Sequence, residues 1–140
     1  MLTIHSGDGG TGRAVAVSGD RITAVGTADE LRALFPHARV REWRGTLGPA
    51  LVHTGPVPDA PSPRERIHAL LRLGVTAVVD GYLTDPALRA AAARGGLTRV
   101  PAGSVPPALA AGGRADLAVF DEAGGCVATV VGGRLVHRRA

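Results

Sequence analysis

The sequence predicts a mixed α/β fold in which strand-rich segments enclose a shorter β/α segment, and three observations support this. Residues 2–25 and 116–137 alternate apolar with polar side chains, which is typical of half-buried strands. Residues 48–100 combine short apolar runs with helix-start signals, which predicts a βαβαβ unit. The 140 residues are 45% hydrophobic, which fits one compact structural unit.

The N-terminal segment predicts strands at 2–5, 13–17 and 21–25, the last two joined by a Gly19-Asp20 turn as a β-hairpin. The glycine-rich loop at 7–12 resembles a phosphate-binding loop only superficially. It has no lysine and precedes a strand rather than a helix, so a structural role is expected.

A short helix should follow, because Thr27 and Glu30 form a capping box in which each side chain satisfies a free backbone N–H. Leu31, Leu34 and Phe35 supply its buried face, and Pro36 ends it. Residues 38–43 alternate again and predict a further strand.

The middle of the chain opens with a short apolar strand predicted at 48–53, followed by a proline-rich stretch that marks a boundary. A second capping box, Ser62 to Glu65, has proline at the first helical position, and Gly74 stops the helix that it opens. Residues 75–79 then predict a fully buried strand.

Asp85-Pro86 caps another helix that ends near Gly95, and 97–100 is a third short strand. Beyond a flexible region at 102–113, strands are predicted at 116–121, 126–131 and 134–137. The last two are joined by a tight Gly132-Gly133 turn. These strands are expected to pair with those of the N-terminal segment.

Both ends of the chain resemble the amidohydrolase superfamily, in particular imidazolonepropionase-like and aminodeoxyfutalosine deaminase-like members. The segment VAVSGDRITAVGTADELRALFPHARVREWRGTLGPALV resembles the opening of these enzymes, and AAGGRADLAVFDEAGGCVATVVGGRLV resembles their closing stretch. IHALLRLGVTAVVD resembles a helix and strand of the family's barrel. The resemblance implies a composite β-sandwich from residues 1–47 and 110–140, and a βαβαβ remnant of a TIM-type barrel at 48–109.

The resemblance also implies a metal site, which this sequence does not preserve. In the family, the first barrel strand ends in a His-x-His pair that binds a divalent metal, since side chains two apart on a strand share a face. Here those positions fall on Gly55 and Val57 without a gap, or on His53 and Gly55 with a two-residue deletion. The pair is broken in either alignment, and the sequence has no lysine to serve as a later ligand.

A complete (β/α)8 barrel needs roughly 200 to 250 residues, so residues 48–109 can hold only two or three β/α steps. A three-stranded parallel fragment leaves open edges that a closed barrel would not have. We therefore expect a homodimer that covers those edges, or else a dedicated protein partner.

Five residues are expected near the carboxyl ends of the barrel-like strands, the edge where β/α folds bind ligands. They form a candidate vestigial pocket. The alternative is that Asp80 and Ser104 cap loops and His53 hydrogen-bonds locally, and this outweighs a catalytic role. His53 alone would be a weak metal site, and we expect no cofactor. The five candidates are His53, Thr54, Asp80, Tyr82 and Ser104.

Three functions follow from the resemblance. The first is a catalytically degenerate amidohydrolase-like protein that acts through binding or assembly. The second is a small hydrolase or deaminase for C–N bonds of cyclic amides or aminopurine-type substrates, with a site rebuilt between subunits from His53 and Asp80. The third is an accessory subunit of a full-length amidohydrolase.

Composition disfavours other classes of protein. The net charge is +4, but the arginines are spread from Arg13 to Arg139 instead of forming one patch, so nucleic-acid binding is not expected. Cys126 is the only cysteine, which excludes an intrachain disulfide and suits the cytoplasm. No leader pattern or long apolar run is present, so neither export nor a membrane span is expected.

Overall fold

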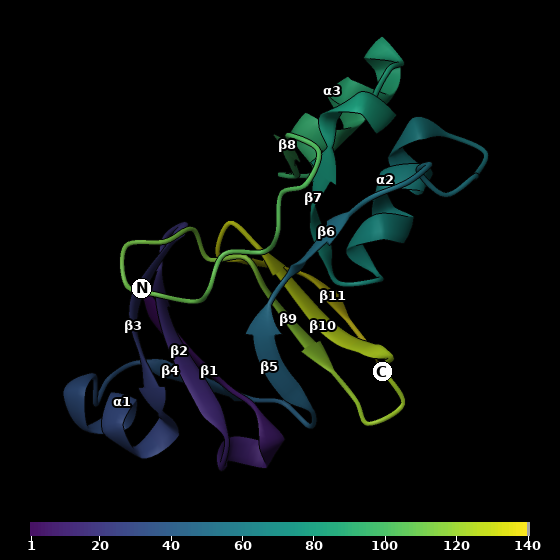
Figure 1. Ribbon diagram of the computed structural model, residues 1–140. Helices are drawn as coiled ribbons and strands as arrows, with labels where there is room; N and C mark the ends of the chain where they lie inside the picture. Colours follow the sequence, from purple (N-terminus) through teal and green to yellow (C-terminus); the bar gives the residue numbers. More distant parts are fainter. Residues whose placement is uncertain (140) are drawn as a thin grey trace.

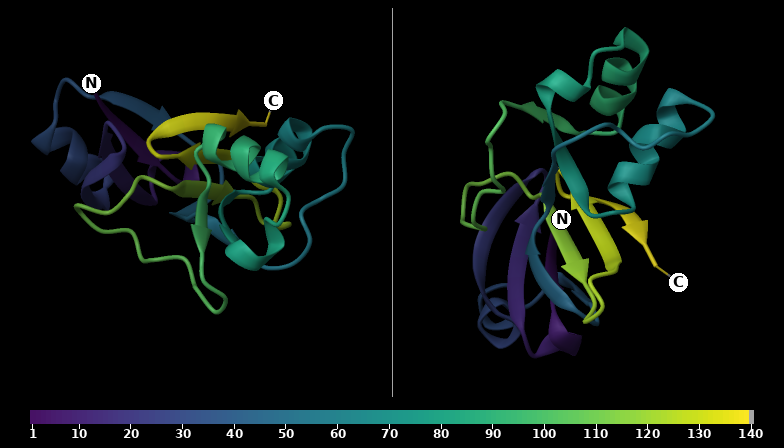
Figure 2. Two further views of the ribbon diagram at one scale, coloured as in Figure 1. Left: turned by 90° about the horizontal axis from the view of Figure 1, so that it is seen from above. Right: turned by 45° about the vertical axis from the view of Figure 1, so that its right-hand side comes forward.

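The computed structural model describes residues 1–139 and confirms the mixed α/β class. A β-sandwich of two four-stranded sheets carries a three-stranded parallel sheet with two helices (Figures 1 and 2). The first sandwich sheet has the order β3-β2-β1-β4, the second β11-β10-β9-β5, and the parallel sheet β6-β7-β8. Residues from both ends of the chain thus build the sandwich, as predicted.

The bounds of the elements are as follows. The first sheet comprises β1 (Leu2–Ser6), β2 (Arg13–Ser18), β3 (Arg21–Thr27) and β4 (Arg39–Glu42). The second comprises β5 (Thr46–Pro49), β9 (Leu117–Phe120), β10 (Cys126–Val131) and β11 (Arg134–Arg138). The parallel sheet comprises β6 (Leu51–His53), β7 (Val75–Val79) and β8 (Thr98–Val100). The helices are α1 (Ala28–Leu34), α2 (Pro63–Leu71) and α3 (Pro86–Arg94), with 3-10 turns η1 (Asp8–Gly10) and η2 (Asp80–Tyr82).

The predicted helix caps are present. The Thr27 hydroxyl accepts a hydrogen bond from the Glu30 N–H, and Ser62 does the same for Glu65. The Asp85 carboxylate accepts from the Ala87 N–H at 3.0 Å. These side chains satisfy backbone donors that would otherwise have no partner, which fixes where each helix begins.

One predicted strand is wrong. The sequence predicts a single strand at 48–53, but β5 ends at Pro49 in the sandwich and β6 begins at Leu51 in the parallel sheet. The chain changes sheets at Ala50, whose N–H donates to the Asp116 carbonyl, whereas the next N–H, of Leu51, donates to the Gly74 carbonyl. The boundaries between the composite sandwich and the barrel remnant, at residues 47/48 and 109/110, stay a prediction.

Strand β10 is the centre of the molecule because both of its faces are buried. Ala128 and Val130 face the sandwich core, whereas Val131 packs with the residues of α2, α3 and β7. The fully buried Thr129 hydroxyl donates to the Leu71 carbonyl at the end of α2, at 2.7 Å. The second sheet is therefore a middle layer between the first sheet and the β/α layer.

The two sandwich sheets also meet at their hairpin turns. Both Gly19 and Gly133 have positive φ, of 60° and 81°. A Cβ on Gly133 would overlap the Gly19 carbonyl oxygen, so no side chain fits there. The neighbouring Ala115 joins both turns, since it donates to the Asp20 carbonyl and accepts from the Gly133 N–H.

A buried histidine lies between the sheets. His5 is 3% exposed, and its Nδ1 accepts a hydrogen bond from Trp43 Nε1 at 3.2 Å. The two rings are stacked at 9°, and the guanidinium of Arg138 lies 5.7 Å from the Trp43 ring centroid. Burial, with a smaller effect of the Arg41 charge, lowers the pKa of His5 to about 4.

Candidate functional site

The carboxyl ends of the three parallel strands meet at one edge of the sheet. His53 of β6 pairs with Val78, and Val79 pairs with Val100 of β8. The sequence-predicted candidates therefore follow strands that end side by side. Their side chains, however, make separate local contacts.

His53 and Thr54 end the first of these strands. His53 Nε2 lies 3.0 Å from the Pro56 carbonyl oxygen, which gives the imidazole a partner three residues away. Thr54 is exposed to solvent. The histidine thus makes the local hydrogen bond that the sequence offered as the alternative to a pocket.

The other three candidates also have local surroundings. Asp80 forms an ion pair with Arg99, with Nη1 and Oδ1 3.4 Å apart. The Ser104 hydroxyl donates to the Pro101 carbonyl at 2.7 Å within a turn. Tyr82 is 40% exposed. Within residues 1–139, no hydrogen bond or ion pair joins any two of the five candidates.

The side chains at this edge do not fit the metal site that the resemblance implies. Val57, at the second ligand position of the ungapped alignment, is 5% exposed and packs in the core of α2 and α3. Gly55, the position shared by both alignments, has no side chain to bind a metal. Among the described residues, no group of three or more His, Cys, Asp or Glu side chains is placed to hold an ion.

Sequence reasoning missed a polar contact that joins the sandwich to the β/α layer. Asp116 Oδ1 accepts from the Gly132 N–H at 2.8 Å and lies 3.4 Å from Arg114 Nε. Arg114 Nη2 also donates to the Gly96 carbonyl, just before β8. Burial raises the pKa of Asp116, although the Gly132 hydrogen bond and the Arg114 charge oppose that shift. The charge pattern Arg-Ala-Asp was the only available signal, and it does not reveal the partners.

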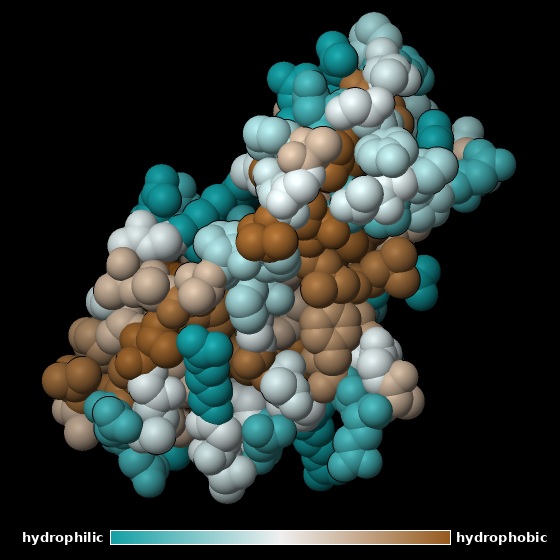
Figure 3. Space-filling model, viewed as in Figure 1, coloured by the Kyte–Doolittle hydropathy of each residue, from teal (hydrophilic) through white to brown (hydrophobic). Residues whose placement is uncertain are grey.

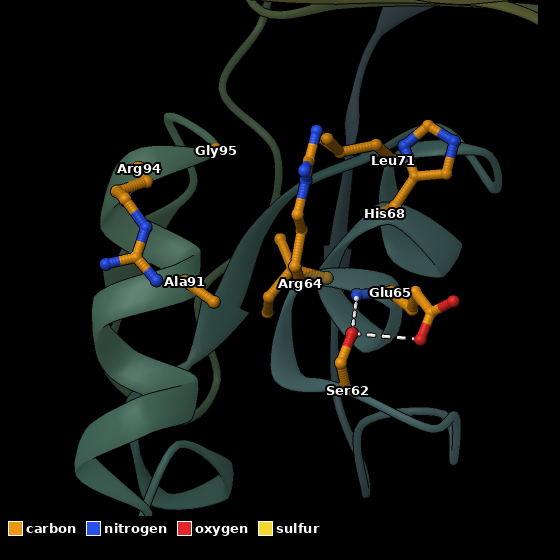
Figure 4. A pocket seen from close by; sticks show the side chains of 9 residues that line it. Ser62, Arg64, Glu65, His68, Leu71, Ala91, Arg94 and Gly95 are labelled. Carbon is orange, nitrogen blue, oxygen red and sulfur yellow. Dashed lines mark hydrogen bonds between the residues drawn. The ribbon is translucent and has the colours of Figure 1, made fainter.

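Three hollows lie within residues 1–139, and none of them is lined by any of the five candidates. Two of the three are lined mainly by residues of the β/α segment. One, of about 860 Å³, is an open groove between α2 and α3, with Arg64 and His68 on one side and Arg94 on the other (Figure 4). Its Ser62 and Glu65 side chains are hydrogen-bonded to each other at 2.9 Å as part of the helix cap. The second hollow, of about 340 Å³, lies on the parallel sheet beneath residues 105–109.

Residues 14–38, which include most of β2 and all of β3 and α1, match the family model of the imidazolonepropionase-like composite domain of bacteria. The family model confirms the resemblance predicted for this part of the sandwich. No curated protein matches the chain.

Three solved structures are similar over part of their length. The crystal structure of Helicobacter pylori aminofutalosine deaminase has 16% identity and a TM-score of 0.39, with 56% of this chain and 27% of that chain covered. A. niger ochratoxinase has 17% identity and a TM-score of 0.43, with 71% of this chain and 30% of that chain covered. Guanine deaminase from Bradyrhizobium japonicum has 15% identity and a TM-score of 0.36, with 47% of this chain and 22% of that chain covered. The chain spans less than a third of the length of each of these proteins.

No helix within residues 1–139 is long and apolar enough to cross a membrane.

Proposed function

We propose that this chain is an amidohydrolase-like protein that has lost the family's metal-dependent reaction and acts through binding or assembly. The observation that carries the proposal is the end of β6. There the ligand positions are occupied by Gly55, which has no donor, and by either His53 or the buried core residue Val57. A valine that packs under α2 and α3 contributes to stability and cannot bind a metal.

The contacts of His53 and Asp80 support the same proposal. A hydrolase rebuilt from these two residues would need both to point at one substrate atom. Instead, His53 contacts the Pro56 carbonyl and Asp80 pairs with Arg99. Neither of these contacts joins the two side chains, as a shared acid–base pair would require.

The test of lost catalysis uses the purified chain, incubated in turn with zinc, iron and manganese and then desalted. We expect less than one tenth of an equivalent of bound metal, and no turnover of cyclic amides or aminopurines above that of the His53→Ala variant. Near-stoichiometric metal, together with hydrolysis that disappears when the metal is removed, would overturn the proposal.

The assembly part of the proposal rests on the open edge of β6. This strand pairs with β7 alone, and it presents Leu51, which is 39% exposed. The Leu51 N–H donates to the Gly74 carbonyl. Gly74 follows the exposed Leu73 in the chain and lies against the Phe120 ring. Apolar side chains gather on this part of the surface, where β6 leaves the sandwich (Figure 3). An unpaired, uncharged edge beside an apolar patch favours pairing with a second copy.

Leu51→Glu is therefore expected to convert a dimer to a monomer, because a carboxylate would be buried without a partner at the paired edge. Light scattering after size exclusion measures the mass. Leu34→Glu on α1 is the matched control and should remain dimeric. Leu34 was predicted to be buried but is 66% exposed, so the variant places the same charge at an exposed leucine far from β6. A wild-type protein that is monomeric at micromolar concentrations, without a bound partner, would contradict assembly through this edge.

We further propose a cytoplasmic location. The support is the single cysteine, Cys126, which requires no oxidising compartment.

A further inference from the structure

The hollow on the parallel sheet has a regular floor. Val52, Ala77 and Thr98 are direct neighbours across β6, β7 and β8, so their side chains share one face of the sheet. Val100 follows two residues after Thr98 on the same face. All four line the hollow, and the smallest of them, Ala77, is in the middle. Helices α2 and α3 pack on the opposite face, so they do not fill this space.

The roof of the hollow is a strap, residues 101–113, which contains no helix or strand. Its beginning is a turn, in which Ser104 bonds to Pro101. Its end is anchored to the sandwich, because Leu109 is buried in the sandwich core and Gly112 and Gly113 exchange two backbone hydrogen bonds with Ile22.

The middle of the strap is held differently. Within the part of the chain that the structure describes, no backbone hydrogen bond joins residues 105–108 to the body, and Pro106 and Pro107 have no N–H to donate. Val105 is 76% exposed. Residues 105–108 can therefore lift from the sheet without breaking a backbone hydrogen bond, while both ends of the strap stay attached, and this gives access to the hollow.

The chemistry of the lining restricts what fits. Most lining side chains are apolar. The two charged ones, Arg114 and Asp116, are ion-paired with each other at 3.4 Å, so neither needs a charged ligand. The Thr98 hydroxyl is the polar side chain on the floor, and among residues 1–139 its one protein partner is the Thr76 carbonyl at 3.5 Å, the outer limit of a hydrogen bond. This hydroxyl can therefore bond a ligand at little cost.

We propose that this hollow binds a small, uncharged, mostly apolar molecule that carries one hydroxyl or carbonyl group, with the Thr98 hydroxyl as its hydrogen-bond partner. A volume of about 340 Å³ is at the small end of ligand pockets, which are usually apolar with a few placed polar groups. The site lies on the face of the sheet beneath the strap, and it depends neither on metal chemistry nor on the loss of hydrolysis.

Titration of ¹⁵N-labelled protein with cyclohexanol, and separately with methylcyclohexane, tests the proposal by amide chemical shifts. We expect saturable shifts at Ala77, Thr98 and residues 105–109, with cyclohexanol binding at least threefold more tightly. Ala77→Leu should weaken both probes at least tenfold, since it fills the middle of the floor. The matched control is Ala33→Leu, which adds the same atoms on the exposed side of α1 and should bind as the wild type does.

Thr98→Val keeps the shape of the side chain and removes the hydroxyl, so it should bind methylcyclohexane as before and lose the preference for cyclohexanol. This variant decides the question even if Ala77→Leu does not fold. The proposal fails if the wild type shows no saturable shifts, if the shifts lie in the groove between α2 and α3, or if Thr98→Val retains the preference.

Discussion

Gly133→Ala is expected to destabilise the fold by roughly 3 kcal/mol or more, through strain and overlap together. Gly133 has a φ of 81°, where a side chain is disfavoured, and a Cβ there would overlap the Gly19 carbonyl oxygen. Because the obstacle is backbone from the other sheet, it cannot turn aside, and the two hairpins must separate. Chemical denaturation followed by circular dichroism measures the loss.

The facing glycine provides the control. Gly19 also has positive φ, but a Cβ there meets nothing within 4 Å, so Gly19→Ala has the conformational strain alone, about 1 to 2 kcal/mol. The difference between the two variants isolates the cost of the overlap. Equal losses for both would show that the hairpin turns do not touch in solution.

The protein is expected to lose stability as the pH falls from 6.5 toward 4, because of His5. Its pKa is about 4 in the fold against 6.5 as the ordinary value, so below pH 6.5 the unfolded chain takes up a proton that the folded chain refuses. The cost grows to roughly 3 kcal/mol near pH 4 and is absent above pH 6.5. Protonation would also place a donor against the Trp43 N–H, close to the charges of Arg41 and Arg138.

Denaturation at several pH values, compared with His5→Gln, separates this effect from the titration of carboxylates. Glutamine is neutral at every pH in this range and its amide oxygen can accept from Trp43 Nε1, so the variant should lack the His5 part of the dependence. Parallel stability curves for the two proteins would mean that His5 is accessible to protons in the fold.

Much of the fold could be predicted because its signals are local. The capping pairs at Thr27 and Ser62 and the Gly19 and Gly132-Gly133 turns depend on residues within a few positions of each other. The change of sheet at Ala50 could not be predicted. An apolar run has the same appearance in the sequence whether it pairs with one sheet or passes between two. The strand's change of sheet depends on hydrogen bonds to the carbonyls of Asp116 and Gly74, which are distant in the sequence.

The candidate site shows the same division. The carboxyl ends of parallel strands lie at one edge of a sheet, so the order of the strands along the chain was enough to infer that His53 and Asp80 lie near each other. Their actual partners, Pro56 and Arg99, depend on rotamers and loop shape. The buried link between the layers from Thr129 to Leu71 spans 58 residues and leaves no pattern in the sequence.

The placement of β9, β10 and β11 also has a consequence for folding during synthesis. The first sheet is complete at Glu42, yet its inner face, with Val15 and Val17, packs mainly against strands that begin at Leu117, with β5 the only earlier strand of the second sheet. On the ribosome, that apolar face has to wait for the whole β/α segment to be translated before it is covered. Until then the nascent chain exposes the apolar face of a half-built sandwich, which favours association with other unfolded chains.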